Sequence, residues 1–260
     1  MTKKSYAKVN IFLKIAGKRD GYHELVSRFV RVHSLYDIMS FQNGSFNEFT
    51  LEGNFGCETK SNTIYKAYVK LCEISSKVEE FFKTTKVVVE KNIPEFAGLG
   101  GGSSNCATFI NMVNEVCQLG LSKDELSKIG ETIGADVPFF IYEFDSANVT
   151  GIGEIVQAFD EKLPEIITFT PKIECNTGKI FTAFRDKFYK EIDQKQADKL
   201  LKLTTKELLK NYSKEYLNDL YEPAVFCEPK LNTAHLTLNT KKAFFSGSGS
   251  SFFYLNEDSI

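Results

Sequence analysis

The residues from Pro94 to Ser104, Pro-Glu-Phe-Ala-Gly-Leu-Gly-Gly-Gly-Ser-Ser, combine four glycines with two serines. They follow the β-branched run Val87 to Val89 and precede apolar residues at helical spacing, Ala107, Ile110, Val113 and Cys117. Glycine lets the backbone approach a ligand closely, and a helix N-terminus directs unpaired N–H groups and a positive dipole end at the same point. The stretch therefore predicts a phosphate-binding loop, to which Ser103 or Ser104 can add a hydroxyl donor.

This loop differs from two common phosphate motifs. No lysine follows the glycines, which excludes the Gly-Lys-Ser/Thr loop of P-loop NTPases. Counted from Gly98, the pattern is G-x-G-x-x-S, so the last glycine of the dinucleotide fingerprint is missing. The alternative is a flexible loop, but the preceding strand and the following amphipathic helix favour a phosphate site.

Two further polar residues, Lys8 and Asn10, lie on one side of an alternating segment. From Ser5 to Ile15 the alternation predicts a strand with Ala7, Val9, Ile11, Leu13 and Ile15 on a core, and with Tyr6, Lys8, Asn10, Phe12 and Lys14 on the opposite face. That face is either solvated or part of a site.

An aspartate, Asp136, stands in Gly134-Ala135-Asp136-Val137-Pro138, between the predicted end of a helix and a predicted strand. The small residues before it leave room for a ligand. An aspartate at such a junction can equally be a turn or capping residue.

The remaining patterns indicate both strands and helices. After a hairpin at Asp20-Gly21, the predicted strands cover residues 26–33, 37–41, 49–52, 86–91, 139–142, 166–173, 242–245 and 252–255. The predicted helices cover 62–81, the segment after Ser103, 122–134, 179–187, 195–203, 205–211 and 213–221. A second glycine-serine run, Ser246 to Ser251, is explained by a hairpin between two strands.

The composition, with 42% hydrophobic and 25% charged residues in 260, is that of an ordinary globular protein. A net charge of −2 gives no electrostatic reason to expect a nucleic-acid or membrane partner. No run approaches the roughly 20 apolar residues of a membrane span. The six cysteines have no metal-ligand spacing and are expected to be reduced thiols, which favours a cytoplasmic protein.

The chain resembles the GHMP kinases, named for galactokinase, homoserine, mevalonate and phosphomevalonate kinases. The resemblance rests on motifs in family order that span residues 7 to 251: Ala7-Lys8-Val9-Asn10, Gly21-Tyr22-His23-Glu24-Leu25, Pro94 to Ser104, Gly134-Ala135-Asp136-Val137-Pro138 and Ser246-Gly247-Ser248-Gly249-Ser250. The glycine loop alone indicates the family. Gly-Tyr-His and Gly-Ala-Asp-Val-Pro select the member that phosphorylates the C2 hydroxyl of a diphosphocytidyl methylerythritol on the non-mevalonate route to isoprenoids.

By this resemblance Asp136 is the general base and Lys8 its cationic partner. The chemistry requires such a pair, since a tertiary alcohol is a poor nucleophile until a carboxylate takes its proton. A nearby ammonium favours the ionised carboxylate and offsets charge on the transferred phosphoryl group.

The resemblance also implies a substrate pocket. Tyr22 and Phe181 would enclose the cytosine ring, and His23 would hydrogen-bond its polar edge. Asn10 and Thr177 would contact the substrate as well, although Thr177 stands in Asn-Thr-Gly where relatives often have Pro-Thr-Pro. Core packing is the alternative for Tyr22 and Phe181.

For ATP, the resemblance implies that the phosphates are bound by Pro94, Glu95, Phe96, Ala97, Gly98, Leu99, Gly100, Gly101, Gly102, Ser103 and Ser104. Asn62 and Lys91 lie where the family contacts adenine. Mg²⁺ is expected to accompany ATP, since it bridges and neutralises nucleotide phosphates, and no tightly bound prosthetic group is expected. The sequence does not identify the metal ligands.

The resemblance implies an α+β fold with two domains, a ribosomal-S5-like ATP-binding and catalytic domain at 1–150 and a ferredoxin-like substrate domain at 151–260. We expect a small-molecule kinase that is a monomer or a weak homodimer. One alternative is another GHMP kinase, acting on homoserine or mevalonate. The other is a non-catalytic nucleotide-binding homologue, which would be expected to have lost Asp136 or Lys8.

Overall fold

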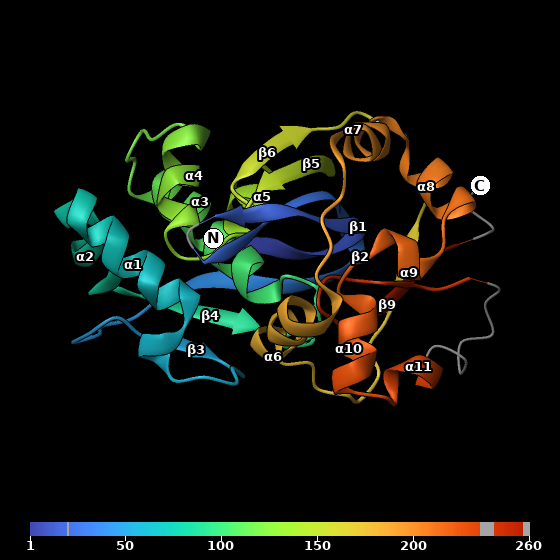
Figure 1. Ribbon diagram of the computed structural model, residues 1–260. Coiled ribbons are helices and arrows are strands. Elements are labelled where there is room, and N and C mark those ends of the chain that lie inside the picture. Colours follow the sequence, from blue (N-terminus) through green and yellow to red (C-terminus); the bar gives the residue numbers. More distant parts are fainter. Residues whose placement is uncertain (20, 235–241, 257–260) are drawn as a thin grey trace. The chain divides into compact units, whose positions relative to one another are not determined.

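The computed structural model describes residues 1–19, 21–234 and 242–256 (Figure 1). The chain forms two compact units that are discontinuous in the sequence. Unit 1 contains Met1–Ala7, Leu35–Ile93 and Gly100–Phe144, and unit 2 contains Lys8–Ser34, Pro94–Leu99 and Asp145–Ile260. Two long strands, β1 (Thr2–Arg19) and β2 (Tyr22–Asn43), pair with each other and contribute to both units. A domain boundary near residue 150 stays a prediction.

Unit 1 combines strands with a group of helices. In it, β4 (Thr85–Glu90) runs antiparallel to β2, with Ile38 opposite Glu90, and parallel to β3 (Leu51–Gly53). Its helical elements are η1 (Thr59–Ser61), α1 (Thr63–Ile74), α2 (Ser76–Phe82), α3 (Gly101–Val116), α4 (Lys123–Glu131) and α5 (Val137–Tyr142). The central helix α3 packs against α1 and α5, and its Phe109 stacks on Phe82 of α2 at 5.5 Å.

Unit 2 contains the other half of β2, which pairs with β5 (Ser146–Gly151), and β5 pairs with β6 (Ile155–Ala158). A second sheet has the order β7 (Ile166–Phe169), β9 (Phe252–Leu255), β8 (Phe244–Phe245). The helical elements are α6 (Thr177–Ala183), η2 (Phe184–Phe188), α7 (Gln194–Lys202), α8 (Thr205–Asn211), α9 (Lys214–Leu217), α10 (Tyr221–Cys227) and α11 (Leu231–Ala234). Ile15, Phe184, Leu231 and Phe252 are among the residues of its core.

The predicted α+β class is confirmed, but one predicted strand is wrong. Residues 139–142 belong to the helix α5, which has Pro138 in its first turn and ends at Glu143 in the left-handed region. The aromatic side chains suggested a strand. Pro138 favours the start of a helix, and burial of all five residues from Val137 to Ile141 stabilises it in this context.

Several predicted boundaries also differ. The predicted helix 62–81 is interrupted at Ser75, which ends α1 and whose hydroxyl caps α2. The predicted strands 26–33 and 37–41 are parts of one strand, β2, and the sequence did not indicate β5, β6 or α10. At the predicted hairpin Gly21 has a φ of 84°, whereas Asp20 lies outside the described residues.

The polar face of β1 is not solvated. Lys8 is 3% exposed, Asn10 is 2% exposed and Phe12 is fully buried. A buried ammonium and a buried amide must find hydrogen-bond partners, because burying them unpaired is costly. The solvated-face alternative is therefore excluded.

All six cysteines lie in the described part of the chain and are free thiols. Among the helices that the structure describes, none has the length and apolar character needed to cross a membrane.

Candidate active site

The start of α3 forms the part of the glycine loop that lies in unit 1. Gly100 occupies the N-cap position with a φ of 71°, in the left-handed region that glycine tolerates best. The N–H of Ser104 donates to the carbonyl of Gly100 at 2.8 Å, so the amides of Gly101, Gly102 and Ser103 precede the first helical hydrogen bond. These groups and the positive end of α3 suit an anion.

The carbonyls of Ala97, Gly98 and Leu99, which lie in unit 2, all accept hydrogen bonds from the protein. Ser251 N donates to Ala97 O at 3.1 Å, Ser246 Oγ donates to Gly98 O at 2.9 Å, and Lys8 N donates to Leu99 O at 2.9 Å. In a planar trans peptide the N–H points away from the C=O. The amides of the residues that follow each carbonyl, 98 to 100, therefore point away from these donors.

Within the described residues, none of these three amides donates to a protein acceptor. The loop thus has its carbonyls turned toward the protein and its amides turned away from it. Pro94, Glu95 and Phe96 are exposed, whereas Ala97 and Leu99 are buried. The outward amides of unit 2 and, separately, the start of α3 in unit 1 each offer donors of the kind that bind phosphate.

Gly98 is fixed by the second glycine loop, Ser246 to Ser251. Gly98 has a φ of 72°, and a Cβ on it would lie 2.2 Å from the carbonyl oxygen of Ser246. No side chain can be accommodated at that distance. The second glycine-serine run therefore supports the first in unit 2, a role that its sequence did not indicate.

Lys8 and Asn10 lie next to this loop in unit 2. The Lys8 ammonium donates to Asn10 Oδ1 at 2.6 Å and to the Gly98 carbonyl at 3.4 Å, and it lies 4.5 Å from the centre of the Phe29 ring. The backbone N–H of Asn10 donates to Ser246 Oγ at 3.3 Å. The structure thus brings Lys8 and Asn10 together with Gly98, in the part of the glycine loop that lies in unit 2.

Asp136 belongs to unit 1, at the N-cap position of α5. It is half-buried, and its side chain makes no capping hydrogen bond. A Cβ on the nearby Gly134 would lie 3.7 Å from Ser103 Oγ, so this turn lies against the first turn of α3. A carboxylate at a helix start is stabilised by the helix dipole. The capping alternative is not supported, since no capping bond forms.

The two residues predicted to contact adenine have structural contacts in unit 1. The Asn62 side chain caps α1 by accepting from Ile64 N at 2.9 Å. The Lys91 ammonium forms a buried ion pair with Asp37 and donates to Asn105 Oδ1 at 2.9 Å. Their contact with adenine stays a prediction.

Sequence reasoning missed Asp37 and Asn105. Asp37 Oδ1 accepts the N–H groups of Asn92 and Ile93, at 2.6 and 2.8 Å, just before the loop begins. Asn105 Nδ2 donates to Asp37 Oδ2 at 2.9 Å. No spacing in the sequence links these positions, because the contacts join residues on separate elements.

The aromatic residues predicted to bind cytosine lie in unit 2. The rings of His23 and Phe181 are stacked, with centres 5.4 Å apart and planes at 23°. Tyr22 is 64% exposed, which excludes core packing for it. His23 Nε2 is buried without a hydrogen-bond partner among the described residues. A buried nitrogen without a partner in the described residues can pair with a ligand, and the binding of cytosine here stays a prediction.

The electrostatic surroundings of His23 favour the neutral imidazole. Burial lowers the pKa of His23 below its usual value of 6.5, and the positive charges of Arg185 and Lys18 lower it further. A neutral imidazole has one donor and one acceptor nitrogen. Nearby, Thr177 at the start of α6 shares a 2.8 Å hydrogen bond with Ser248 of the second glycine loop.

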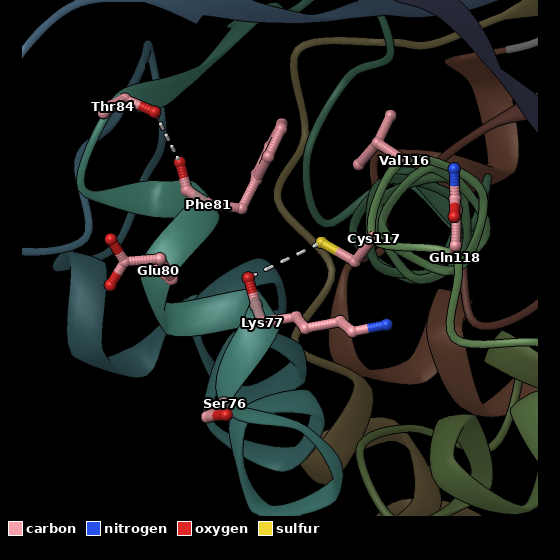
Figure 2. Close-up of a pocket in the computed structure, with 8 residues that line it drawn as sticks. All are labelled: Ser76, Lys77, Glu80, Phe81, Thr84, Val116, Cys117 and Gln118. Atoms are coloured by element: carbon pink, nitrogen blue, oxygen red, sulfur yellow. Dashed lines mark hydrogen bonds between the residues drawn. The ribbon is translucent and has the colours of Figure 1, made fainter.

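A separate pocket of about 730 Å³ lies in unit 1 and is lined by residues of α2 and of the C-terminal end of α3 (Figure 2). None of the predicted site residues lines it. Its lining residues are Ser76, Lys77, Glu80, Phe81, Thr84, Val116, Cys117 and Gln118. The pocket is therefore distinct from the candidate site.

Comparison with known proteins agrees with these motifs. The model of the GHMP kinases N terminal domain matches residues 62–144. The 4-diphosphocytidyl-2-C-methyl-D-erythritol kinase of Sulfurimonas denitrificans is 49% identical, over 98% of this chain and 96% of the relative. The protein of the same name from Sulfurovum sp. is 47% identical, over 97% of this chain and 98% of the relative.

A solved structure of 4-(cytidine 5'-diphospho)-2C-methyl-D-erythritol kinase superposes with a TM-score of 0.77 at 29% identity, covering 99% of this chain and 90% of that one. The similarity extends over nearly the whole chain rather than over the glycine loop alone. The chain therefore belongs to the 4-diphosphocytidyl-2-C-methyl-D-erythritol kinase family of the GHMP kinases and has the fold of that family.

Proposed function

We infer that this protein uses ATP to phosphorylate the C2 hydroxyl of 4-diphosphocytidyl-2-C-methyl-D-erythritol, on the non-mevalonate route to isoprenoid precursors. The observation that carries this inference is the 49% identity, across nearly the full length of both chains, to a kinase named for that substrate. The loop geometry supports it independently, since outward amides followed by a helix start suit a polyphosphate.

The glycine loop binds the ATP phosphates. The amides of residues 98 to 100 and of Gly101 to Ser103 are the donors, and the Ser103 hydroxyl can add another. The loop itself has no lysine. Its attraction for phosphate therefore comes from backbone dipoles and hydroxyl groups.

Asp136 acts as the general base. It takes the proton of the C2 hydroxyl while the bond from that oxygen to the γ-phosphorus forms and the bond to the β,γ-bridging oxygen breaks. Positioned general base catalysis contributes about 10²–10⁴-fold.

Lys8 supplies positive charge during the transfer. Its ammonium is held by Asn10 Oδ1 and the Gly98 carbonyl, and it is 3% exposed. A charge that is fixed before the reaction stabilises the transferred phosphoryl group without reorganisation of solvent.

Tyr22, His23 and Phe181 recognise the cytosine ring, and Thr177 and Asn10 contact the rest of the substrate. His23 Nε2 has no hydrogen-bond partner among the described residues, and the neutral ring can pair with both donors and acceptors of cytosine. The exposed Tyr22 ring provides a flat apolar face for stacking.

Mg²⁺ enters with ATP. Among the described residues, no group of three or more histidine, cysteine, aspartate or glutamate side chains could hold a metal ion. Mg²⁺ is usually bound through one or two carboxylates together with phosphate oxygens and water, so its binding here does not require such a group. When bound, the ion neutralises phosphate charge.

The test is to incubate the purified protein with ATP, Mg²⁺ and the diphosphocytidyl substrate and to follow the 2-phosphate product by ³¹P NMR. Homoserine, mevalonate and 2-C-methylerythritol phosphate are offered separately as control alcohols. Phosphorylation of mevalonate or homoserine instead would favour the alternative GHMP kinase. ATP binding without transfer to any of these alcohols would favour a non-catalytic homologue. Equal turnover of methylerythritol phosphate would contradict the cytosine pocket.

A further inference from the structure

A buried serine of β2, Ser27, is hydrogen-bonded to the side chain of Asn10, which in turn accepts a hydrogen bond from Lys8. Ser27 is fully buried and lies opposite Val149 of β5 in the register of the sheet. Its Oγ accepts a hydrogen bond from Asn10 Nδ2 at 3.1 Å and donates to the Phe12 carbonyl. All of these residues belong to unit 2.

The direction of these bonds is fixed by the number of protons available. A serine hydroxyl has one hydrogen, and here it is donated to Phe12 O. The Ser27 oxygen can therefore only accept a hydrogen bond from Asn10, so the NH₂ group of the Asn10 amide must face Ser27. The carbonyl side, Oδ1, must face the other way, where the Lys8 ammonium lies at 2.6 Å.

The hydrogen bond from Lys8 requires the same orientation of the Asn10 amide. An ammonium only donates, so a reversed Asn10 amide would place its NH₂ against Lys8 Nζ and lose the bond to Ser27 as well. Without the amide oxygen, Lys8 would lose its 2.6 Å hydrogen bond, which is shorter than its 3.4 Å contact with Gly98 O.

We propose that Ser27 is a positioning residue for phosphoryl transfer, because it orients the Asn10 amide so that Oδ1 fixes the Lys8 ammonium. This rests on the proposed function, in which Lys8 supplies charge to the transferred group. The Phe12 carbonyl, the Ser27 hydroxyl and the Asn10 amide form one chain of directed hydrogen bonds that ends at Lys8.

The first test is Ser27→Ala. We expect kcat to fall about ten- to a hundredfold, the size of loss that a misplaced group causes, while KM for ATP and for the diphosphocytidyl substrate stays within about twofold. Ser27→Thr keeps the hydroxyl and is expected to restore most of kcat. If Ser27→Ala does not fold, Ser27→Cys, which has a similar size and a weak donor, replaces it.

The matched control is Ser5→Ala on β1. Ser5 is also fully buried, but its hydroxyl has no hydrogen-bond partner among the described residues. The same loss of an oxygen atom is expected to leave kcat unchanged there. Equal losses in the two variants would mean a general packing effect and would overturn the proposal.

A double-mutant cycle separates positioning from an independent role. If Ser27 acts through Asn10, Ser27→Ala adds no further loss of kcat in the Asn10→Ala background. Losses that multiply would show that Ser27 acts without Asn10, and the proposal would be wrong.

Different measurements would contradict the proposed function and the inference about Ser27. A wild-type protein that does not phosphorylate the diphosphocytidyl substrate contradicts the function. The geometry is then tested by the side-chain amide NMR signals of Asn10, identified by their loss in Asn10→Ala. We expect them to shift in Ser27→Ala and not in Ser5→Ala, and unchanged signals in both would contradict the orienting contact.

Discussion

At the scale of single residues, the carboxylate of Asp136 has the clearest expected effect. Asp136→Asn keeps the shape and removes the charge that accepts the proton. The side chain makes no capping bond at the start of α5, so the substitution removes no helix cap. We expect kcat to fall at least about 100-fold, within the range of general base catalysis, with KM for ATP and substrate nearly unchanged in steady-state assays.

The control for Asp136→Asn is Asp193→Asn. Asp193 is also an N-cap aspartate, at α7, and its side chain accepts from Gln196 N at 3.0 Å. Asparagine is an equally good N-cap, so this variant should keep full activity and stability. Unchanged turnover in Asp136→Asn would remove Asp136 from its proposed role.

The pH dependence of substrate binding is expected to follow His23. Its pKa in the folded protein is lowered from 6.5, first by burial and then by Arg185 and Lys18. Between the lowered pKa and 6.5 the unfolded chain binds more protons than the folded one, so the contribution of His23 to stability is complete above pH 6.5 and is lost as the pH falls.

The neutral ring is also the form that offers an acceptor to cytosine. KM for the diphosphocytidyl substrate should therefore rise as the pH falls through the lowered pKa, below 6.5, and stay flat above it. The measurement is KM at a series of pH values in the wild type and in His23→Gln, which has no titrating ring. An identical acid limb in both proteins would show that another group titrates.

At the scale of elements, the second glycine loop depends on Asn218, which is 2% exposed. Its Nδ2 donates to the carbonyls of Phe245 and Gly247, at 3.0 and 2.9 Å, and its Oδ1 accepts from Leu220 N at 2.8 Å. Asn218→Ala leaves buried backbone groups without partners, at about 1–3 kcal/mol for each unsatisfied group.

We expect Asn218→Ala to lower the free energy of unfolding by at least that amount in denaturant titrations. Asn232→Ala, at an exposed position on α11, is the control and should change it by less than about 0.5 kcal/mol. A stable Asn218→Ala variant would mean that water satisfies these carbonyls.

The elements also show what local sequence patterns can predict. The helix α8 and the strand β9 were predicted with their observed bounds, because capping residues and short-range periodicity define them. The helix α5 was predicted as a strand, because its aromatic residues fit both structures and burial within unit 1 favours the helix. Local pattern cannot distinguish the two in a short, wholly apolar run.

The residues of the candidate site likewise include some that a local sequence pattern indicates and some that it does not. The glycine loop, Lys8 and Asp136 belong to contiguous motifs, so the sequence could propose them as site residues. Ser27, Asp37 and Asn218 were missed because each acts on residues that are far from it in the chain, as Asp37 does on Lys91. Only the folded structure shows which buried polar groups satisfy one another.

At the scale of the whole molecule, stability depends on a fully buried arginine, Arg28 of β2. Its guanidinium donates to Asn148 Oδ1 at 2.7 Å and to the carbonyls of Leu201 and Leu203, at 2.8 and 3.1 Å, and it pairs with buried Glu161 at 3.4 Å. Burial lowers the pKa of Arg28 to about 10, so the side chain stays charged at neutral pH.

Arg28→Met would leave Glu161 buried without its cation. Breaking a buried pair in this way costs about 3–5 kcal/mol, which we expect as the loss in unfolding free energy measured in urea. Arg185→Met removes an exposed cation, 46% exposed, and should change stability by less than about 0.5 kcal/mol. A similar loss in both variants would contradict a special role for the buried arginine.

In the proposed role of the glycine loop, its fixed carbonyls also affect the entropy of nucleotide binding. Ordering the backbone of one residue costs about 1–2 kcal/mol. At Ala97, Gly98 and Leu99 that ordering is completed when the protein folds, through Ser251, Ser246 and Lys8. A polyphosphate therefore meets dipoles that already point outward, and its binding energy is not consumed in organising the loop.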